Sequence, residues 1–108
     1  MSEKKLRPAT LVVHQGKDRD PFTGAATVPI YQASTYHHPD GQSGTYDYAR
    51  SGNPSREQVE EAVALLENGT HGFAYASGMA AIGSALTLLK SGDHLIVPED
   101  LYGGSYRY

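Results

Sequence analysis

The stretch that decides the fold is HGFAYASGMAAIGSALTLLKSGDHLIVP, residues 71–98. Its first seven residues form a short apolar run that is typical of a buried strand. Apolar side chains at helical spacing follow, and a Ser-Gly pair after Lys90 predicts the end of that helix. Residues 94–98 predict a second strand, so about thirty residues indicate a βαβ unit with parallel strands and a right-handed crossover. The side chains expected on the buried face of the helix are Met79, Ile82, Leu86 and Leu89.

A second helix is predicted directly before this unit, in NPSREQVEEAVALLENGT. Asn53 is a suitable N-cap, Pro54 fits the first helical position, and acidic residues occupy the early turns. Gly69 is expected to end the helix. The apolar positions at i, i+3, i+4 and i+7, which predict its buried face, are Val59, Ala62, Val63 and Leu66.

Residues 1–52 show no regular period and contain several prolines, with short extended pieces at residues 10–16 and 28–35. We expect an extended N-terminal arm that contacts a neighbouring subunit. Residues 53–108 are expected to begin an α/β domain. Two parallel strands cannot complete such a domain, because its sheet is covered by helices on both faces. We therefore expect the chain to be the N-terminal piece of a longer protein.

The composition of the 108 residues narrows the function classes. The net charge of −3 lacks the basic excess of nucleic-acid-binding domains, and no apolar run is long enough to span a membrane. The N-terminus does not resemble a signal peptide, and the absence of cysteine is compatible with the cytoplasm. The five histidines show no metal-ligand spacing, so no metal site is expected.

A candidate anion site lies in ASGMAAI, residues 76–82, where the first predicted strand meets its helix. A helix N-terminus has unpaired N–H groups and the positive end of the dipole, and Gly78 has no Cβ to block a close approach. This arrangement suits a phosphate. An ordinary strand-to-helix turn with Ser77 as its N-cap explains the same residues. A nucleotide-binding domain is a weaker interpretation, because both glycine-rich nucleotide motifs are missing.

Two further motifs could contribute to such a site. In TYDYARSGNPSR, residues 45–56, an extended backbone would place Tyr46, Tyr48 and Arg50 on one face, where they could bind an anion. An amphipathic edge strand with a solvated arginine is the alternative, and the spacing alone favours it. DLYGGSYR, residues 100–107, follows the second predicted strand, and its Gly-Gly pair predicts a tight turn that could present Tyr102 to a planar ligand. A plain Gly-Gly turn with a partly packed tyrosine is the alternative.

In their order and spacing, YDYARSGNPSR, ASGMAAI and DLYGGSYR resemble the Cys/Met-metabolism family of pyridoxal-phosphate (PLP) enzymes. Its members include the cystathionine β- and γ-lyases, cystathionine γ-synthase, methionine γ-lyase and the O-acetylhomoserine sulfhydrylases. VPIYQASTY, residues 28–36, is also similar to the family's N-terminal arm. The resemblance implies the α/β fold of PLP-dependent transferases (fold type I, aspartate-aminotransferase-like), with this chain as its N-terminal part.

The resemblance also implies a role for individual residues. Tyr48 and Arg50 match the pair that reaches into a neighbouring subunit and binds the cofactor phosphate there. Gly78 and Met79 match the backbone donors to the phosphate within their own subunit. Tyr102 matches the catalytic tyrosine that stacks on the cofactor ring and takes part in proton transfer. The cofactor-binding set that the resemblance implies, with Ser77 beside the glycine, is Tyr48, Arg50, Ser77, Gly78, Met79 and Tyr102.

The family's Schiff-base lysine lies beyond residue 108, so the chain alone should be inactive. For the full-length protein, the resemblance implies a PLP-dependent carbon–sulfur lyase of the cystathionine β/γ-lyase type, in transsulfuration and methionine biosynthesis. The expected protein is a cytoplasmic homotetramer, a dimer of dimers, that acts on a sulfur amino acid. The alternative within the family is γ-replacement, by a cystathionine γ-synthase or an O-acetylhomoserine sulfhydrylase. A non-catalytic binding or oligomerisation module is the alternative of another class.

Overall fold

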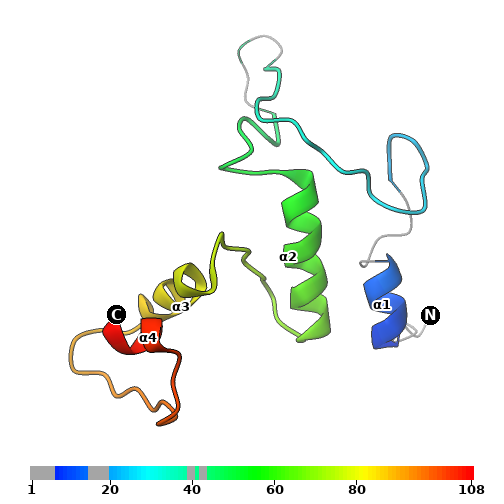
Figure 1. The fold of residues 1–108 in the computed structure, drawn as a ribbon. Coiled ribbons are helices and arrows are strands. Elements are labelled where there is room, and N and C mark those ends of the chain that lie inside the picture. Colours follow the sequence, from blue (N-terminus) through cyan, green and yellow to red (C-terminus); the bar gives the residue numbers. More distant parts are fainter. Residues whose placement is uncertain (1–6, 15–19, 39–40, 42–43) are drawn as a thin grey trace. The chain divides into compact units, whose positions relative to one another are not determined.

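The computed structural model describes residues 7–14, 20–38, 41 and 44–108. Within these ranges the regular elements are helices joined by irregular segments (Figure 1). None of these helices is long and apolar enough to cross a membrane. The helices are α1 (Pro8–His14), α2 (Pro54–Leu66), α3 (Gly78–Leu86) and α4 (Gly103–Arg107).

The chain divides into two compact units, residues 1–72 and residues 73–108. The first unit contains α1 and α2, which contact each other, and the second contains α3 and α4, which also form a contact. The division into an arm of residues 1–52 and a domain that starts at residue 53 stays a prediction.

The N-terminus of α2 lies where the sequence predicts it. Asn53 has an extended backbone, and its Oδ1 accepts a hydrogen bond from the amide of Ser55 at 2.9 Å, while Pro54 occupies the first helical position. The Nδ2 of Asn53 donates in another direction, to the carbonyl of Tyr31 at 3.3 Å and the hydroxyl of Tyr36 at 3.2 Å. One side chain therefore caps the helix and fastens the preceding arm segment to it.

Helix α2 ends at Leu66, and the left-handed residue that follows it is Asn68, one position before the predicted Gly69. Asn68 has the left-handed φ of 54°, and the amide of Gly69 then donates to the carbonyl of Ala64 at 2.8 Å. This is the hydrogen bond of a Schellman motif, in which an asparagine can replace the usual glycine. Gly69 is thus part of the predicted stop, but it is not the left-handed residue.

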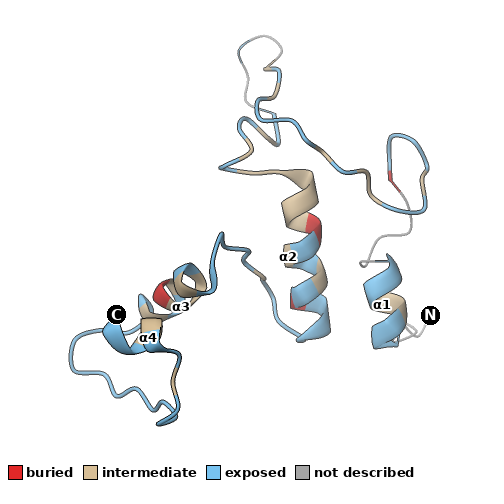
Figure 2. Cartoon of the chain, in the orientation of Figure 1, coloured by how far each residue is buried: buried red, intermediate tan, exposed pale blue. Residues whose placement is uncertain are grey.

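The predicted buried face of α2 is wrong. Val59 is 56% exposed, and Val63 and Leu66 are also exposed, whereas Gln58 and Ala64 are the buried residues (Figure 2). An amphipathic helix buries its apolar stripe only against a partner layer. In the described part of residues 1–72, no element covers this stripe.

Helix α1 also departs from the sequence-based expectation, which was an extended piece at residues 10–16. The carbonyl of Arg7 accepts the amides of Thr10 at 2.9 Å and Leu11 at 3.0 Å, and Pro8 at the first position has a φ suited to a helix start. Helix α1 contacts α2, but none of its residues is buried, and its valines weaken helix propensity. Residues 15 and 16 lie outside the described part of the chain.

The rest of the arm is irregular, as the sequence predicts. Residues 20–38 contain no helix, and one antiparallel bridge joins Thr35 to Tyr48. Beside it, the amide of Ala49 donates to the carbonyl of Ser34 at 2.8 Å. These bonds hold the arm against the segment that leads into α2.

The two predicted strands are not formed. Residues 71–77 and 94–98 lie outside every helix and strand that the structure describes. Their apolar side chains are exposed, with Phe73 at 72% and Ile96 at 96% (Figure 2). A parallel strand is stable within a sheet that helices cover on both faces, and the described part of residues 73–108 contains no such sheet.

Helix α3 is shorter than predicted. It ends at Leu86, after which the amides of Leu88 and Leu89 bond to carbonyls three residues earlier, at 3.2 and 3.1 Å. Such bonds tighten the chain into 3₁₀-type turns. The positive φ of Gly92, 98°, lies in the turn that follows. Of the predicted buried face, Met79, Ile82 and Leu86 are half-buried and Leu89 is exposed.

Candidate functional site

A hollow of about 390 Å³ opens beside the N-terminus of α3, within residues 73–108. We call it the α3 hollow. It brings together four of the six residues that the sequence predicts as cofactor-binding, and Ile82 joins them. The residues that line it are Ser77, Gly78, Met79, Ile82 and Tyr102.

The N-terminus of α3 offers free donors to this hollow. Ser77 has an extended backbone, and its Oγ accepts the amide of Ala80 at 3.1 Å, which confirms it as the N-cap. The amides of Gly78 and Met79 have no hydrogen-bond acceptor among the described residues. A Cβ added at Gly78 would meet no atom within 4 Å, so the space beside it is open. Two unpaired amides at the positive end of a helix dipole suit an anion.

Tyr102 forms the aromatic wall of the α3 hollow. It stands at the N-cap position of α4, makes no capping bond through its side chain, and is 69% exposed. The ring lies against Gly104, where an added Cβ would come within 2.6 Å of Tyr102 Cε1 and 3.0 Å of Met79 Sδ. Ser105 Oγ also donates to that sulfur at 3.7 Å. The ring is therefore packed on one side and free on the other.

The predicted Gly-Gly turn in residues 100–107 is wrong. Neither Gly103 nor Gly104 has a positive φ, and α4 begins at the first of them. The amide of Ser105 donates to the carbonyl of Tyr102 at 2.9 Å, so the chain winds directly into a helical turn. Gly104 instead allows a close approach of the Tyr102 ring. A Gly-Gly pair in the sequence is compatible with either role, a tight turn or a close approach.

Tyr48 and Arg50 lie in the other unit, at the end of the arm. The amides of Ser51 and Gly52 donate to the carbonyl of Tyr48 at 2.9 and 3.0 Å, so the chain turns at Arg50. The extended backbone that would align Tyr46 with both residues therefore ends at Tyr48, contrary to prediction. The turn still brings the pair together, because the Arg50 guanidinium lies 4.9 Å from the centre of the Tyr48 ring.

Tyr46 is engaged in packing. Its hydroxyl donates to Glu57 Oε2 at 2.5 Å, and its ring lies 5.4 Å from that of Tyr36. Burial, reinforced by the hydrogen bond to Glu57, raises the pKa of Tyr46 to about 12. The phenol is therefore neutral at ordinary pH, and it links the arm to the first turns of α2.

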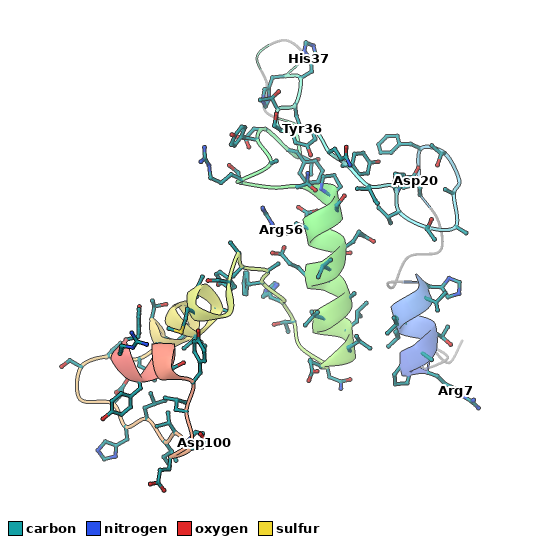
Figure 3. The ribbon with its side chains drawn as sticks, viewed as in Figure 1. Arg7, Asp20, Tyr36, His37, Arg56 and Asp100 are labelled. Atoms are coloured by element: carbon teal, nitrogen blue, oxygen red, sulfur yellow. The ribbon has the colours of Figure 1, made fainter. Side chains whose placement is uncertain are left out.

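Sequence reasoning missed Arg56, whose side chain extends from the N-terminal end of α2 (Figure 3). Its guanidinium donates to the carbonyls of Ala49 and Ser51, both at 2.9 Å, and to that of Arg50 at 3.4 Å. The available signal was its place in a first helical turn, where a cation opposes the helix dipole.

The α3 hollow suits a small ligand with an anionic group and a flat ring. The anion would meet the unpaired amides of Gly78 and Met79, and the ring would lie against Tyr102. The volume of the α3 hollow falls in the range of small-molecule sites. In the part of the chain that the structure describes, no group of three or more His, Asp or Glu side chains is placed to hold a metal ion.

Comparison with known proteins agrees with this chemistry. The sequence profile of the Cys/Met metabolism PLP-dependent enzymes matches residues 9–108. A cystathionine beta-lyase of Coxiella burnetii is 52% identical to this chain over 107 residues, which cover 98% of this chain and 28% of that protein. The chain thus spans little more than a quarter of the length of this curated relative.

Solved structures show the same family. The cystathionine gamma-lyase of Lactobacillus plantarum matches 94% of this chain with a TM-score of 0.80 and 46% identity, over 27% of its own length. A cystathionine gamma synthase of Xanthomonas oryzae pv. oryzae matches 96% with a TM-score of 0.82 and 44% identity, also over 27% of its length. These matches confirm the predicted fold class, the N-terminal part of a fold type I PLP-dependent enzyme. The chain belongs to the Cys/Met metabolism PLP-dependent enzyme family.

Proposed function

We propose that the full-length protein carrying this chain is a PLP-dependent lyase that cleaves the C–S bond of cystathionine or a similar sulfur amino acid. The observation that carries this proposal is the α3 hollow, where unpaired helix amides and an exposed tyrosine ring lie together. The similarity to a cystathionine beta-lyase supports the choice of a lyase within the family.

The residues of the hollow fit the phosphate end of pyridoxal phosphate. The amides of Gly78 and Met79 would donate to the phosphate oxygens, and the helix dipole would favour the negative charge. Ser77 Oγ already caps the helix through Ala80, so its contribution is to hold these amides in place. When bound, pyridoxal phosphate supplies an electron sink for negative charge that develops on the substrate.

Tyr102 would serve on the ring side of the same site. Its free face would pack against the cofactor ring, and its hydroxyl oxygen would hold or pass a proton during cleavage. Tyr48 and Arg50 would complete the phosphate site from a neighbouring subunit, with the guanidinium binding two phosphate oxygens. We further propose a cytoplasmic homotetramer, built as a dimer of dimers.

The activity is tested with the full-length protein and cystathionine. β-Cleavage with one water yields homocysteine, pyruvate and ammonia, whereas γ-cleavage yields cysteine, 2-oxobutyrate and ammonia. We expect pyruvate, as for a β-lyase. The similarity to a cystathionine gamma synthase makes O-acetylhomoserine plus cysteine the necessary comparison. Formation of cystathionine and acetate from that pair, without cleavage of cystathionine, would replace the lyase proposal by γ-replacement.

Sharing of the site between subunits is tested by mixing two inactive variants. If Arg50 and Tyr102 serve sites in different subunits, a mixed dimer of Arg50→Ala and Tyr102→Ala has one site with both defects and one with neither. Activity should then reappear on mixing after dissociation and reassembly. No recovery in mixed dimers of confirmed composition would mean that Arg50 does not act in the partner's site.

A further inference from the structure

Arg56 stands where a positive charge is unfavourable. It is the third residue of α2 (Pro54–Leu66), close to the positive end of the helix dipole. A cation in this turn destabilises a helix, whereas Glu57 beside it has the favourable sign. The contacts of its side chain must therefore offset this unfavourable position.

The guanidinium of Arg56 binds three consecutive backbone carbonyls of the preceding turn. Nη1 donates to Ala49 at 2.9 Å and Arg50 at 3.4 Å, and Nη2 donates to Ser51 at 2.9 Å. Its Nε lies 3.6 Å from Glu60 Oε1, one helical turn further on. The planar guanidinium thus binds the carbonyls of the turn through its two Nη atoms and faces Glu60 of the helix through Nε.

These contacts fix the backbone from which the Arg50 side chain extends. Within the turn, the amides of Ser51 and Gly52 donate to the carbonyl of Tyr48. The Arg56 side chain binds the carbonyls of the same turn, among them those of Ala49 and Ser51. The Arg50 guanidinium then lies over the Tyr48 ring at 4.9 Å. A bidentate contact to an anion requires the guanidinium to be placed within a fraction of an ångström. A turn that is held by its own amides and by Arg56 can provide such placement.

We propose that Arg56 is a positioning residue that holds the turn of residues 49–51 and thereby sets the affinity of Arg50 for the cofactor phosphate. This inference rests on the function proposed above, in which Arg50 binds that phosphate. Arg56 itself donates to the backbone carbonyls of this turn, so in this proposal it acts through the turn.

The substitution Arg56→Lys separates positioning from charge. A lysine side chain at this position would keep the positive charge near the turn, but a single ammonium on a flexible stem cannot bind three carbonyls in one plane. The matched control is Glu60→Gln, which removes the ion pair with Arg56 and leaves the three carbonyl bonds possible. The two side chains are only partly exposed, but an i,i+4 ion pair at 3.6 Å still contributes little to helix stability.

The experiment compares wild type, Arg56→Lys, Arg50→Ala and Glu60→Gln in the full-length protein. Dissociation constants are measured for pyridoxal phosphate and for pyridoxal, which lacks the phosphate. Hydrogen exchange of the Ser51 and Gly52 amides is measured in the cofactor-free protein. We expect Arg56→Lys to weaken pyridoxal phosphate binding about tenfold, leave pyridoxal binding unchanged and speed exchange at both amides. Glu60→Gln should resemble wild type.

Other outcomes overturn the inference. If Arg50→Ala weakens pyridoxal phosphate binding but Arg56→Lys does not, the phosphate role stands and the positioning role fails. If Arg56→Lys weakens both ligands equally, its effect is on general stability and not on the phosphate contact. If Arg50→Ala leaves the phosphate preference intact, the proposed phosphate role fails and the inference fails with it.

Discussion

The ring of Tyr102 lies so close to Gly104 that a Cβ at residue 104 would come within 2.6 Å of the tyrosine Cε1. The same Cβ would come within 3.0 Å of Met79 Sδ, which belongs to the wall of the α3 hollow. A Cβ contact of 2.6 Å does not occur in folded proteins unless a neighbour moves, and one of 3.0 Å is unusually tight. Gly104 therefore determines where the aromatic wall of the hollow can stand.

Gly104→Ala should displace the Tyr102 ring and weaken cofactor binding several-fold, because the extra Cβ has no space. Gly103→Ala is a matched control, since a Cβ there meets no atom within 4 Å. Both variants replace a glycine of the same short helix by a better helix former. Titration of each full-length variant with pyridoxal phosphate checks this, and equal affinities for the two would refute the steric role.

Gly78→Ala tests the opposite situation, a glycine beside open space. The added Cβ contacts no protein atom, so the fold should be retained and the melting temperature should not fall. The Cβ would occupy space that the phosphate needs, so pyridoxal phosphate should bind more weakly. Thermal unfolding without cofactor and a binding titration separate the two effects. A variant with unchanged affinity would place the phosphate elsewhere.

Asn53→Asp and Asn53→Ala distinguish the two functions of this amide. Alanine removes the cap on Ser55 as well as the bonds to Tyr31 and Tyr36, and should cost about 1 kcal/mol or more. Aspartate keeps the cap and adds a favourable charge at the helix N-terminus, but it loses both donated bonds. We expect aspartate to destabilise less than alanine in denaturant unfolding. The reverse order would show that the aspartate charge beside the Tyr31 carbonyl and the Tyr36 hydroxyl costs more than the cap contributes.

The raised pKa of Tyr46 predicts a loss of stability at high pH. Its pKa rises from 10.0 to about 12 in the folded chain, so the fold favours the neutral phenol. That contribution is complete below pH 10 and disappears as the pH rises from 10 to 12. Wild type should therefore lose stability in this window relative to Tyr46→Phe, which cannot ionise. Parallel stability curves for the two proteins would contradict the raised pKa.

The features that the sequence predicted correctly depend on local chemistry. Asn53 and Ser77 cap their helices through bonds to residues two or three positions away, and Pro54 needs only its own φ. Capping signals of this kind can be read directly from the order of residues. The same local signals predicted the anion site at the α3 hollow, because Gly78 directly follows the N-cap Ser77.

The features that the sequence predicted wrongly depend on contacts between distant residues. Apolar residues 71–77 and 94–98 are typical of strands, but a strand requires partners that the described chain does not supply. Helix α1 contacts α2, and no local pattern at residues 8–14 reveals this distant neighbour. Arg56 was missed because its partners are carbonyls, and carbonyls leave no mark in the sequence.

In the proposed enzyme, Arg50 and the α3 hollow bind the cofactor phosphate. The most direct test of this role is the ratio of two affinities of the full-length protein, that for pyridoxal phosphate divided by that for pyridoxal. Wild type should prefer the phosphorylated form strongly. Arg50→Ala should reduce that preference roughly 10- to 100-fold, as expected for the loss of charge-assisted hydrogen bonds, with no loss of fold by circular dichroism. A preference that is absent in wild type, or unchanged in Arg50→Ala, would contradict the phosphate site.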